Sequence, residues 1–127
     1  MREILFRGKR VDNGEWAEGT NFYIAKNEVE SFIENVRIDP ETIGQYTGLT
    51  DKNGNKIFEG DIVKIYLYEP KGLANYEIGC IKYDDTKARF VFCTEEGNYG
   101  IDNSNVFEVI GNIHDNPELL KEGVNNA

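Results

Sequence analysis

The stretch of sequence with the clearest potential for chemistry is DKNGNKIFEGDIV, residues 51–63, which opens with oxygen-bearing side chains at alternate positions. These side chains are Asp51, Asn53 and Asn55. An EF-hand loop spaces its first calcium ligands in this way, but it also needs glycine at position 6 and a bidentate glutamate at position 12. Here those two positions hold Lys56 and Ile62. The spacing therefore excludes an EF-hand calcium site.

A tight turn is the better interpretation of the same stretch. Asn53-Gly54 lies between extended segments, and an Asn-Gly pair in that setting is a strong β-hairpin signal. A second break at Gly60-Asp61 precedes the predicted strand Ile62–Tyr68. We expect the polar residues here to shape the backbone.

Carboxylates near predicted turns are the next candidates, because a pair of them could serve as general acid and base. Such a pair needs two different environments that separate its pKa values, and nothing in the sequence brings two of these groups together. With 23 acidic residues in the chain, neighbouring acids arise by chance. We predict no catalytic, cofactor-binding or metal-binding residue, no cofactor and no enzymatic activity. The carboxylates near predicted turns are those of Glu41, Glu59, Asp61, Asp84, Asp85, Glu95 and Glu96.

Nucleophilic and zinc chemistry would have to come from two cysteines and one histidine. Cys80 and Cys93 are thirteen residues apart on predicted neighbouring strands, and His114 is far from both in the sequence. That set does not have the ligand spacing of a zinc site. A cross-strand disulfide is geometrically possible, but a reducing compartment favours two free thiols.

Basic and aromatic residues alternate in IKYDDTKARFVF, residues 81–92, as they do in surfaces that stack and clamp a single nucleic-acid strand. A half-buried hairpin produces the same alternation without a ligand, and we favour that interpretation. The other basic cluster is Arg2, Arg7, Lys9 and Arg10. This cluster is typical of a solvated edge strand whose charges prevent pairing with a strand of another molecule.

The formal net charge of −9 disfavours binding to phosphates. An acidic surface that imitates DNA is a further alternative. Such decoys carry dense rows of carboxylates, whereas the acidic residues here are scattered among lysines.

The elements that would position these residues are mainly strands. Glycine is frequent, and the chain has seven tyrosines and seven phenylalanines, which favours β-structure with tight turns. Asn13-Gly14 predicts a hairpin turn with positive φ at both residues, between a strand over residues 2–7 and a return strand over 16–24. Further strands are expected over 45–49, 56–58, 76–83, 88–94, 99–101 and 107–113, and EPKGLAN, residues 69–75, is predicted as a loop.

Three segments carry helical signals. Residues 26–38 place apolar side chains at helical spacing and are predicted as a helix, with strand as the alternative. Asp39 and Pro40 predict a capped helical turn. Asn116 and Pro117 do the same near the C-terminus, where Leu119 and Leu120 should fold back on the body and Gly123 should end the turn.

These elements predict one mainly antiparallel β-domain over residues 1–127, either a small barrel or a strongly curved sheet with short helices. Its core should cover about residues 1–120, and residues 121–127 should be a frayed tail. Hydrophobic runs are too short to span a bilayer, and there is no stretch of signal-peptide length. We therefore expect no membrane association and a cytoplasmic location.

Three blocks of the sequence, in order and at their spacing, resemble the YopX family of phage and prophage proteins. They are MREILFRGKRV, DPETIGQYTGLTDKNGNKIFEGDIV and FEVIGNIHDNPELL, and the resemblance spans nearly the whole chain. It implies a mainly β fold, self-assembly into homo-oligomers and a phage or prophage origin. It carries no catalytic residues over, because the shared residues are those that a fold needs.

The hypothesis from these observations is a non-enzymatic phage or prophage accessory protein that acts as an oligomeric binding module. Its expected partners are further copies of itself and a host or phage protein. The alternatives are a nucleic-acid-binding small barrel, which the net charge disfavours, and the acidic decoy of a DNA-binding host protein.

Overall fold

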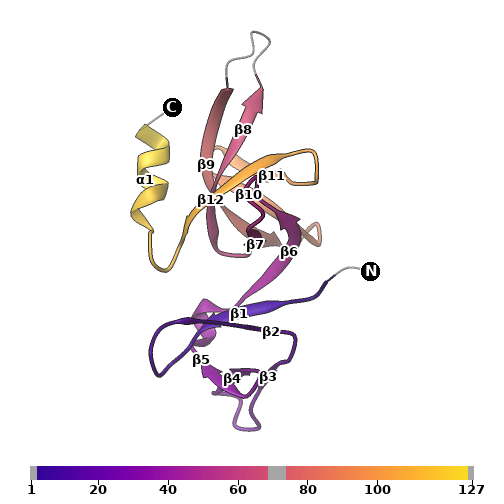
Figure 1. The fold of residues 1–127 in the computed structure, drawn as a ribbon, viewed down its shortest axis with the longest axis vertical. Helices are drawn as coiled ribbons and strands as arrows, with labels where there is room; N and C mark the ends of the chain where they lie inside the picture. Colours follow the sequence, from indigo (N-terminus) through magenta and orange to yellow (C-terminus); the bar gives the residue numbers. More distant parts are fainter. Residues whose placement is uncertain (1–2, 69–73, 126–127) are drawn as a thin grey trace. The chain divides into compact units, whose positions relative to one another are not determined.

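The computed structural model describes residues 3–68 and 74–125 and forms two compact units, residues 1–48 and 49–127. The backbone is mainly antiparallel β-structure, as predicted (Figure 1). The described strands form three open sheets and do not close into a barrel. The predicted loop 69–75 lies mostly outside the described residues.

The first unit contains two small groups of strands and one helical turn. Its elements are β1 (Phe6–Lys9), β2 (Trp16–Gly19), β3 (Phe22–Ile24), β4 (Ser31–Ile33), β5 (Val36–Ile38), the 3₁₀ turn η1 (Pro40–Thr42) and the start of β6 (Gly44–Thr50). β1 lies between β2 and β6, and β4 lies between β3 and β5. The predicted return strand 16–24 is thus interrupted between β2 and β3.

The β1–β2 hairpin forms with a different turn from the predicted one. Only Gly14 has a positive φ, of 73°. The connection is a longer loop that the Arg10 amide closes by donating to the Glu15 carbonyl over 2.8 Å. Asn13 contributes its side-chain oxygen, which accepts from the Glu15 amide. An asparagine that bonds its neighbour's backbone in this way does not need left-handed backbone itself.

The helix predicted over residues 26–38 is wrong, and the strand alternative is correct. β4 and β5 form a hairpin whose turn residues Glu34 and Asn35 both have positive φ, of 49° and 68°. That backbone cannot belong to a right-handed helix. The Glu34 carboxylate also accepts from the amides of Thr20 and Asn21, which fixes the turn against the preceding loop.

The helical turn at Asp39 and Pro40 is confirmed. Pro40 begins η1, and the Asp39 carboxylate accepts from the Glu41 amide over 3.0 Å.

The second unit consists of a hairpin, a five-stranded sheet and one helix. Its elements are the end of β6, β7 (Lys56–Phe58), β8 (Asp61–Tyr68), β9 (Ala74–Asp84), β10 (Arg89–Thr94), β11 (Gly97–Gly100), β12 (Val106–Asn112) and α1 (Glu118–Asn125). The sheet order is β11-β10-β9-β8-β12, with every pair antiparallel. The predicted break at Gly60-Asp61 is confirmed, with a φ of 90° at Gly60.

One face of this sheet is the core of the second unit. The fully or nearly fully buried side chains that pack together there are Ile57, Val63, Ile65, Ile81, Phe92 and Phe107. Successive side chains on a strand point to opposite faces, so the alternate residues of β8, β9 and β10 form a second face. Tyr66, Tyr76, Cys80 and Cys93 belong to that second face by their register.

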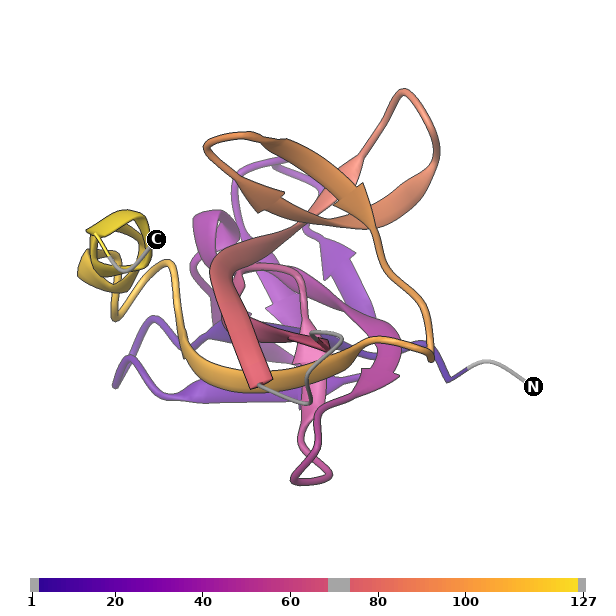
Figure 2. The same cartoon turned by 90° about the horizontal axis from the view of Figure 1, so that it is seen from above.

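Helix α1 contacts β9, and both views show it beside that strand (Figures 1 and 2). Leu119 and Leu120 are half-buried, which confirms that they fold back on the body. The helix continues past Gly123, which was predicted to end it. The Asn116 side-chain oxygen accepts from the amide of Asn112, which precedes the helix, and the Asn116 carbonyl accepts from the Leu119 amide. Among the described residues, no helix is long and apolar enough to cross a bilayer.

Candidate functional site

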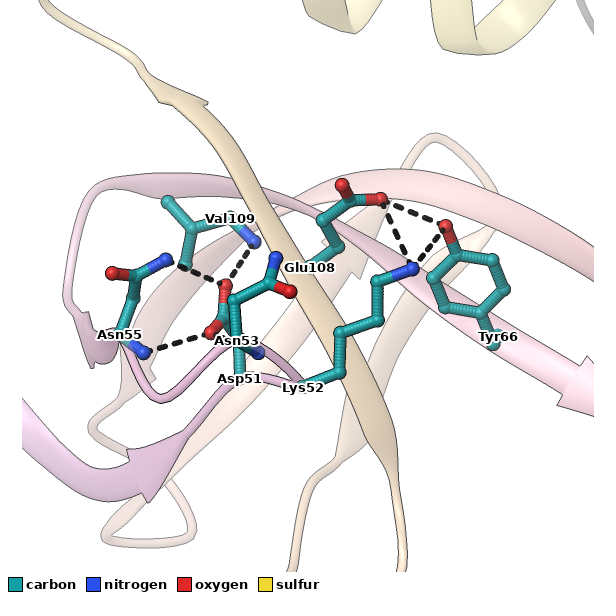
Figure 3. A network of polar contacts seen from close by, with 7 residues as sticks. All are labelled: Asp51, Lys52, Asn53, Asn55, Tyr66, Glu108 and Val109. Carbon is teal, nitrogen blue, oxygen red and sulfur yellow. Dashed lines mark hydrogen bonds and ion pairs between the residues drawn. The ribbon is translucent and has the colours of Figure 1, made fainter.

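The turn that resembled a calcium loop is organised around the carboxylate of Asp51, which is only 6% exposed (Figure 3). One oxygen accepts from the amides of Asn53 and Asn55, over 2.9 and 2.8 Å. The other accepts from the amide of Val109 on β12, over 3.0 Å, and from the side chain of Asn55 over 3.3 Å. Asp51 thus joins its own turn to a strand 58 residues away.

The chemistry of this cluster is that of an anion held by N–H donors. Partial burial opposes ionisation of Asp51, but its hydrogen bonds to Val109, Asn55 and Asn53 together outweigh burial and lower its pKa. A cation in the same place would need oxygen atoms that are free to coordinate it. The structure therefore supports the prediction that the polar residues of this turn shape the backbone.

Next to the turn, two tyrosines and two lysines form an ordered surface on the second face of the sheet. Tyr66 on β8 is directly opposite Tyr76 on β9, and their ring centroids are 6.1 Å apart. The Nζ atom of Lys52 lies 4.7 Å from the centroid of Tyr66, and that of Lys64 lies 4.5 Å from the centroid of Tyr76. We call this surface, with Glu108, the tyrosine platform.

Glu108 on β12 fixes one half of the tyrosine platform. Its carboxylate accepts from the hydroxyl of Tyr66 over 2.7 Å and lies 3.9 Å from the ammonium of Lys52 (Figure 3). The Tyr66 ring is therefore held between a hydrogen bond and a cation. Tyr76 is 37% exposed, so its half of the platform is open to a partner.

The two cysteines are directly opposite each other on β9 and β10. Both are free thiols; Cys80 is buried and Cys93 is half-buried. They contribute to a cavity of about 640 Å³ that β9, β10 and α1 surround. Its other lining includes apolar and charged side chains, among them Tyr76, Ile78, Lys82, Leu120 and Lys121.

The carboxylates of the predicted turns are spread over several parts of the structure. Asp61 is buried and accepts from the Phe58 amide over 2.8 Å, and Asp84 accepts from the amide and hydroxyl of Thr86. Asp85 is exposed in the β9–β10 turn, and Glu95 and Glu96 line the cavity. Glu41 lies in η1. The hydrogen bonds of the Asp61 and Asp84 carboxylates organise the turns in which these two residues lie.

The hairpin that alternates basic and aromatic residues does not present them together. Tyr83 and Phe90 pair across β9 and β10 with ring centroids 5.3 Å apart. By strand alternation, Lys82 and Arg89 belong to the opposite face. A stacking clamp needs both kinds of side chain on one surface, so the structure favours the predicted half-buried hairpin.

The N-terminal basic residues described by the structure lie in the first unit. Arg7 and Lys9 approach the ring of Trp16, at 4.3 and 5.2 Å from its centroid. Arg10 forms an ion pair with Asp12, at 2.8 Å. Arg2 lies outside the described residues. His114 is exposed beside β12, and its amide donates to the Asn112 side chain.

Sequence reasoning did not find the tyrosine platform or the cavity. Both depend on the β8–β9 and β9–β10 registers, which put Tyr66 opposite Tyr76 and Cys80 opposite Cys93. The sequence signal for the cysteines was their placement on neighbouring predicted strands. The sequence did not predict that Tyr66 and Tyr76 lie opposite each other, because the predicted loop between their strands does not determine the register of the pairing.

Comparison with known proteins identifies a family and a similar solved structure. None of the curated proteins matches the chain at a significant level. The crystal structure of protein EF1440 from Enterococcus faecalis is similar, with 28% sequence identity and a TM-score of 0.56, covering 94% of this chain and 99% of that one. The family model described as YopX protein matches residues 5–121. The chain therefore belongs to the YopX protein family.

Proposed function

We propose that this protein is a non-enzymatic binding module of phage or prophage origin that self-associates through the tyrosine platform in the cytoplasm of its host. The observation that carries the proposal is the pair of directly opposed tyrosines, each with a lysine over its ring, on a partly exposed sheet face. Tyrosines are enriched in the buried centres of protein interfaces, where a few such anchors supply most of the binding energy.

The rigidity of the tyrosine platform supports a binding role. Immobilising a flexible side chain on association costs free energy, and a side chain that is already held avoids part of that cost. Tyr66 is held by Glu108 and Lys52 before any partner arrives. The platform therefore offers ordered aromatic area at a reduced entropic cost.

Charge supports a second copy of this chain as the occupant. The formal net charge of the chain is −9, whereas the platform combines two lysines with one carboxylate. The two lysines of the platform can pair with carboxylates on the acidic surface of another copy. Phage or prophage origin and the host cytoplasm enter the proposal as what the sequence resemblance to the YopX family of phage and prophage proteins implies.

The test is sedimentation velocity across a concentration series of the full chain, with light scattering as a second measure of mass. We expect concentration-dependent self-association, and we expect Tyr76→Ala to raise its dissociation constant at least about tenfold, as loss of a central interface anchor does. Circular dichroism checks that the variant is folded.

The matched control is Tyr83→Ala, because Tyr83 is also an exposed tyrosine of β9 but belongs to the other face of the sheet. It should leave the dissociation constant within about twofold, since a residue outside the interface contributes little. A strict monomer at every concentration, or equal effects of the two substitutions, would refute the proposed surface.

A further inference from the structure

The pairing of Cys80 with Cys93 across β9 and β10 places them at a backbone separation that a disulfide can span. Directly opposite residues of an antiparallel pair have Cα atoms about 4.5 or 5.5 Å apart, and their side chains share a face. Disulfides form when the Cα atoms are about 4.4–6.8 Å apart. Cys80 and Cys93 occupy such a pair, so the sheet holds them within that range.

The backbone beside the cysteines fixes their register. A Cβ atom placed on Gly79 would lie 2.5 Å from the carbonyl oxygen of Cys93 and 2.9 Å from the ring of Phe92. β9 and β10 therefore approach each other more closely here than any other residue type at position 79 would allow. Because Phe92 is buried in the core on the other face, this close approach is anchored by packing.

A reagent can reach the cysteines through the cavity that both of them line. Cys93 is the more exposed of the two, and its Sγ atom lies 3.9 Å from the Thr94 carbonyl oxygen. Burial, with a contribution from the neighbouring Cys93, raises the pKa of the Cys80 thiol, while Lys82 opposes that change. The thiolate is the reactive form of cysteine, and burial disfavours the thiolate of Cys80. We therefore expect the more exposed Cys93 to react first with the reagent. Cys80 then attacks the mixed disulfide and closes the bond between the two cysteines.

We propose that Cys80 and Cys93 are an oxidisable dithiol, a modification site that reacts with a low-molecular-weight disulfide and closes a cross-strand disulfide at the wall of the cavity. The proposal is independent of self-association through the tyrosine platform.

The reaction is an ordinary thiol–disulfide exchange in two steps. The Cys93 thiolate attacks one sulfur of the reagent disulfide, which breaks that S–S bond and releases the first small thiolate, which takes up a proton. The Cys80 thiol then loses its proton and attacks the Cys93 sulfur of the mixed disulfide, releasing the second small thiol. The two cysteines are oxidised, and the reagent is reduced to two thiols.

Closing the bond would alter the part of the sheet that faces α1. The cavity wall would lose two S–H groups, and β9 would be joined covalently to β10. Because α1 contacts β9, the redox state of the two cysteines would change the surface against which the helix packs.

The test uses the fully reduced chain and glutathione disulfide at a pH of about 8, near the ordinary pKa of a thiol. After alkylation, mass spectrometry of the native protein should show loss of two hydrogens, no alkylated cysteine and a linkage between the Cys80 and Cys93 peptides. Cys80→Ser should instead accumulate a glutathione adduct on Cys93. The disulfide should also raise the thermal midpoint of the wild type by several degrees, as a cross-link that constrains the unfolded chain does.

Two further measurements separate a preformed dithiol from two unrelated thiols. In denaturant, the intramolecular bond should form at least tenfold more slowly, because the sheet no longer holds the cysteines together. Phenylarsine oxide, which bridges paired thiols, should bind the native wild type at least tenfold more tightly than either serine variant. Retention of two alkylatable thiols, or equal closure rates in native and denatured protein, would overturn the proposal.

Discussion

Replacing Asp51 with alanine is expected to lower the free energy of unfolding by about 3 kcal/mol, because the substitution leaves several N–H groups without their acceptor. The Asp51 carboxylate accepts hydrogen bonds from the backbone amides of Asn53, Asn55 and Val109 at the same time. The first two hold the turn, and the third ties it to β12. Chemical denaturation monitored by circular dichroism measures the loss.

The matched control for this substitution is Asp84→Ala. Asp84 also accepts from an amide two residues ahead, that of Thr86, but its bonds stay within one exposed turn. Since surface substitutions away from buried networks usually change stability by no more than about 0.5 kcal/mol, the control should cost far less than Asp51→Ala. Equal losses would show that Asp51 acts only as a local turn residue.

The pH dependence of stability gives the same network a second test. The hydrogen bonds of Asp51 hold its folded-state pKa below the ordinary value of about 4, against the effect of burial. Its stabilising contribution is therefore complete above a pH of about 4 and is lost as the pH falls through the folded-state pKa. The stability difference between wild type and Asp51→Asn should be constant near neutral pH and should narrow in that acidic range.

Other carboxylates with lowered pKa values do not disturb this comparison. Asp12, Asp84, Asp102 and Glu34 all have hydrogen bonds or charges that favour their ionised forms. They are present in both proteins, so their contributions cancel in the difference. A stability difference that does not change with pH would contradict the ionised role of Asp51.

Local signals in the sequence predicted those parts of the fold that local chemistry decides. Asn53-Gly54 and Gly60 mark turns because their backbone needs φ values that glycine adopts at low cost, and both glycines have positive φ. Asp39 and Pro40 predict η1 for equally local reasons. The strand order and the curvature of the sheets depend on pairings between distant segments, and no local signal specifies them.

The segment 26–38 shows where such reasoning fails. Its apolar spacing fits a helix as well as two short strands, and the outcome depends on the turn at Glu34 and Asn35. Glutamate is a good helix former, so the residue type of Glu34 does not predict its positive φ. The carboxylate of Glu34 accepts from the amides of Thr20 and Asn21, which lie fourteen and thirteen residues earlier in the chain. A tertiary contact decided this local structure.

The cysteines and the tyrosine platform illustrate the same limit at the candidate sites. Residue types alone indicated two thiols on neighbouring strands and many tyrosines. Shifting one strand by a single residue would move its side chains to the other face, which would separate Cys80 from Cys93 and Tyr66 from Tyr76. Register is fixed by packing on the core face, so the candidate sites follow from the hydrophobic core beneath them.

Phe92→Ala is therefore expected to lower the free energy of unfolding by about 3–5 kcal/mol, which is the usual cost of truncating a core phenylalanine to alanine. Phe92 is 1% exposed, and its ring lies against Gly79 of β9, where an added Cβ would be 2.9 Å from it. Hydrogen exchange should show the loss of protection first in β9 and β10, since both strands pack on this ring.

Two control substitutions separate the core packing of Phe92 from the pairing of its strand. Tyr99→Ala removes an aromatic ring from the residue directly opposite Phe92 on β11, but Tyr99 is 47% exposed. It should cost about 1 kcal/mol or less, in the range of a cross-strand pair. Phe92→Leu should fall between the two, because it keeps an apolar side chain in the core. If Phe92→Ala also weakens phenylarsine oxide binding to the folded protein while Tyr99→Ala does not, then the core side of the sheet sets the cysteine register on the other side.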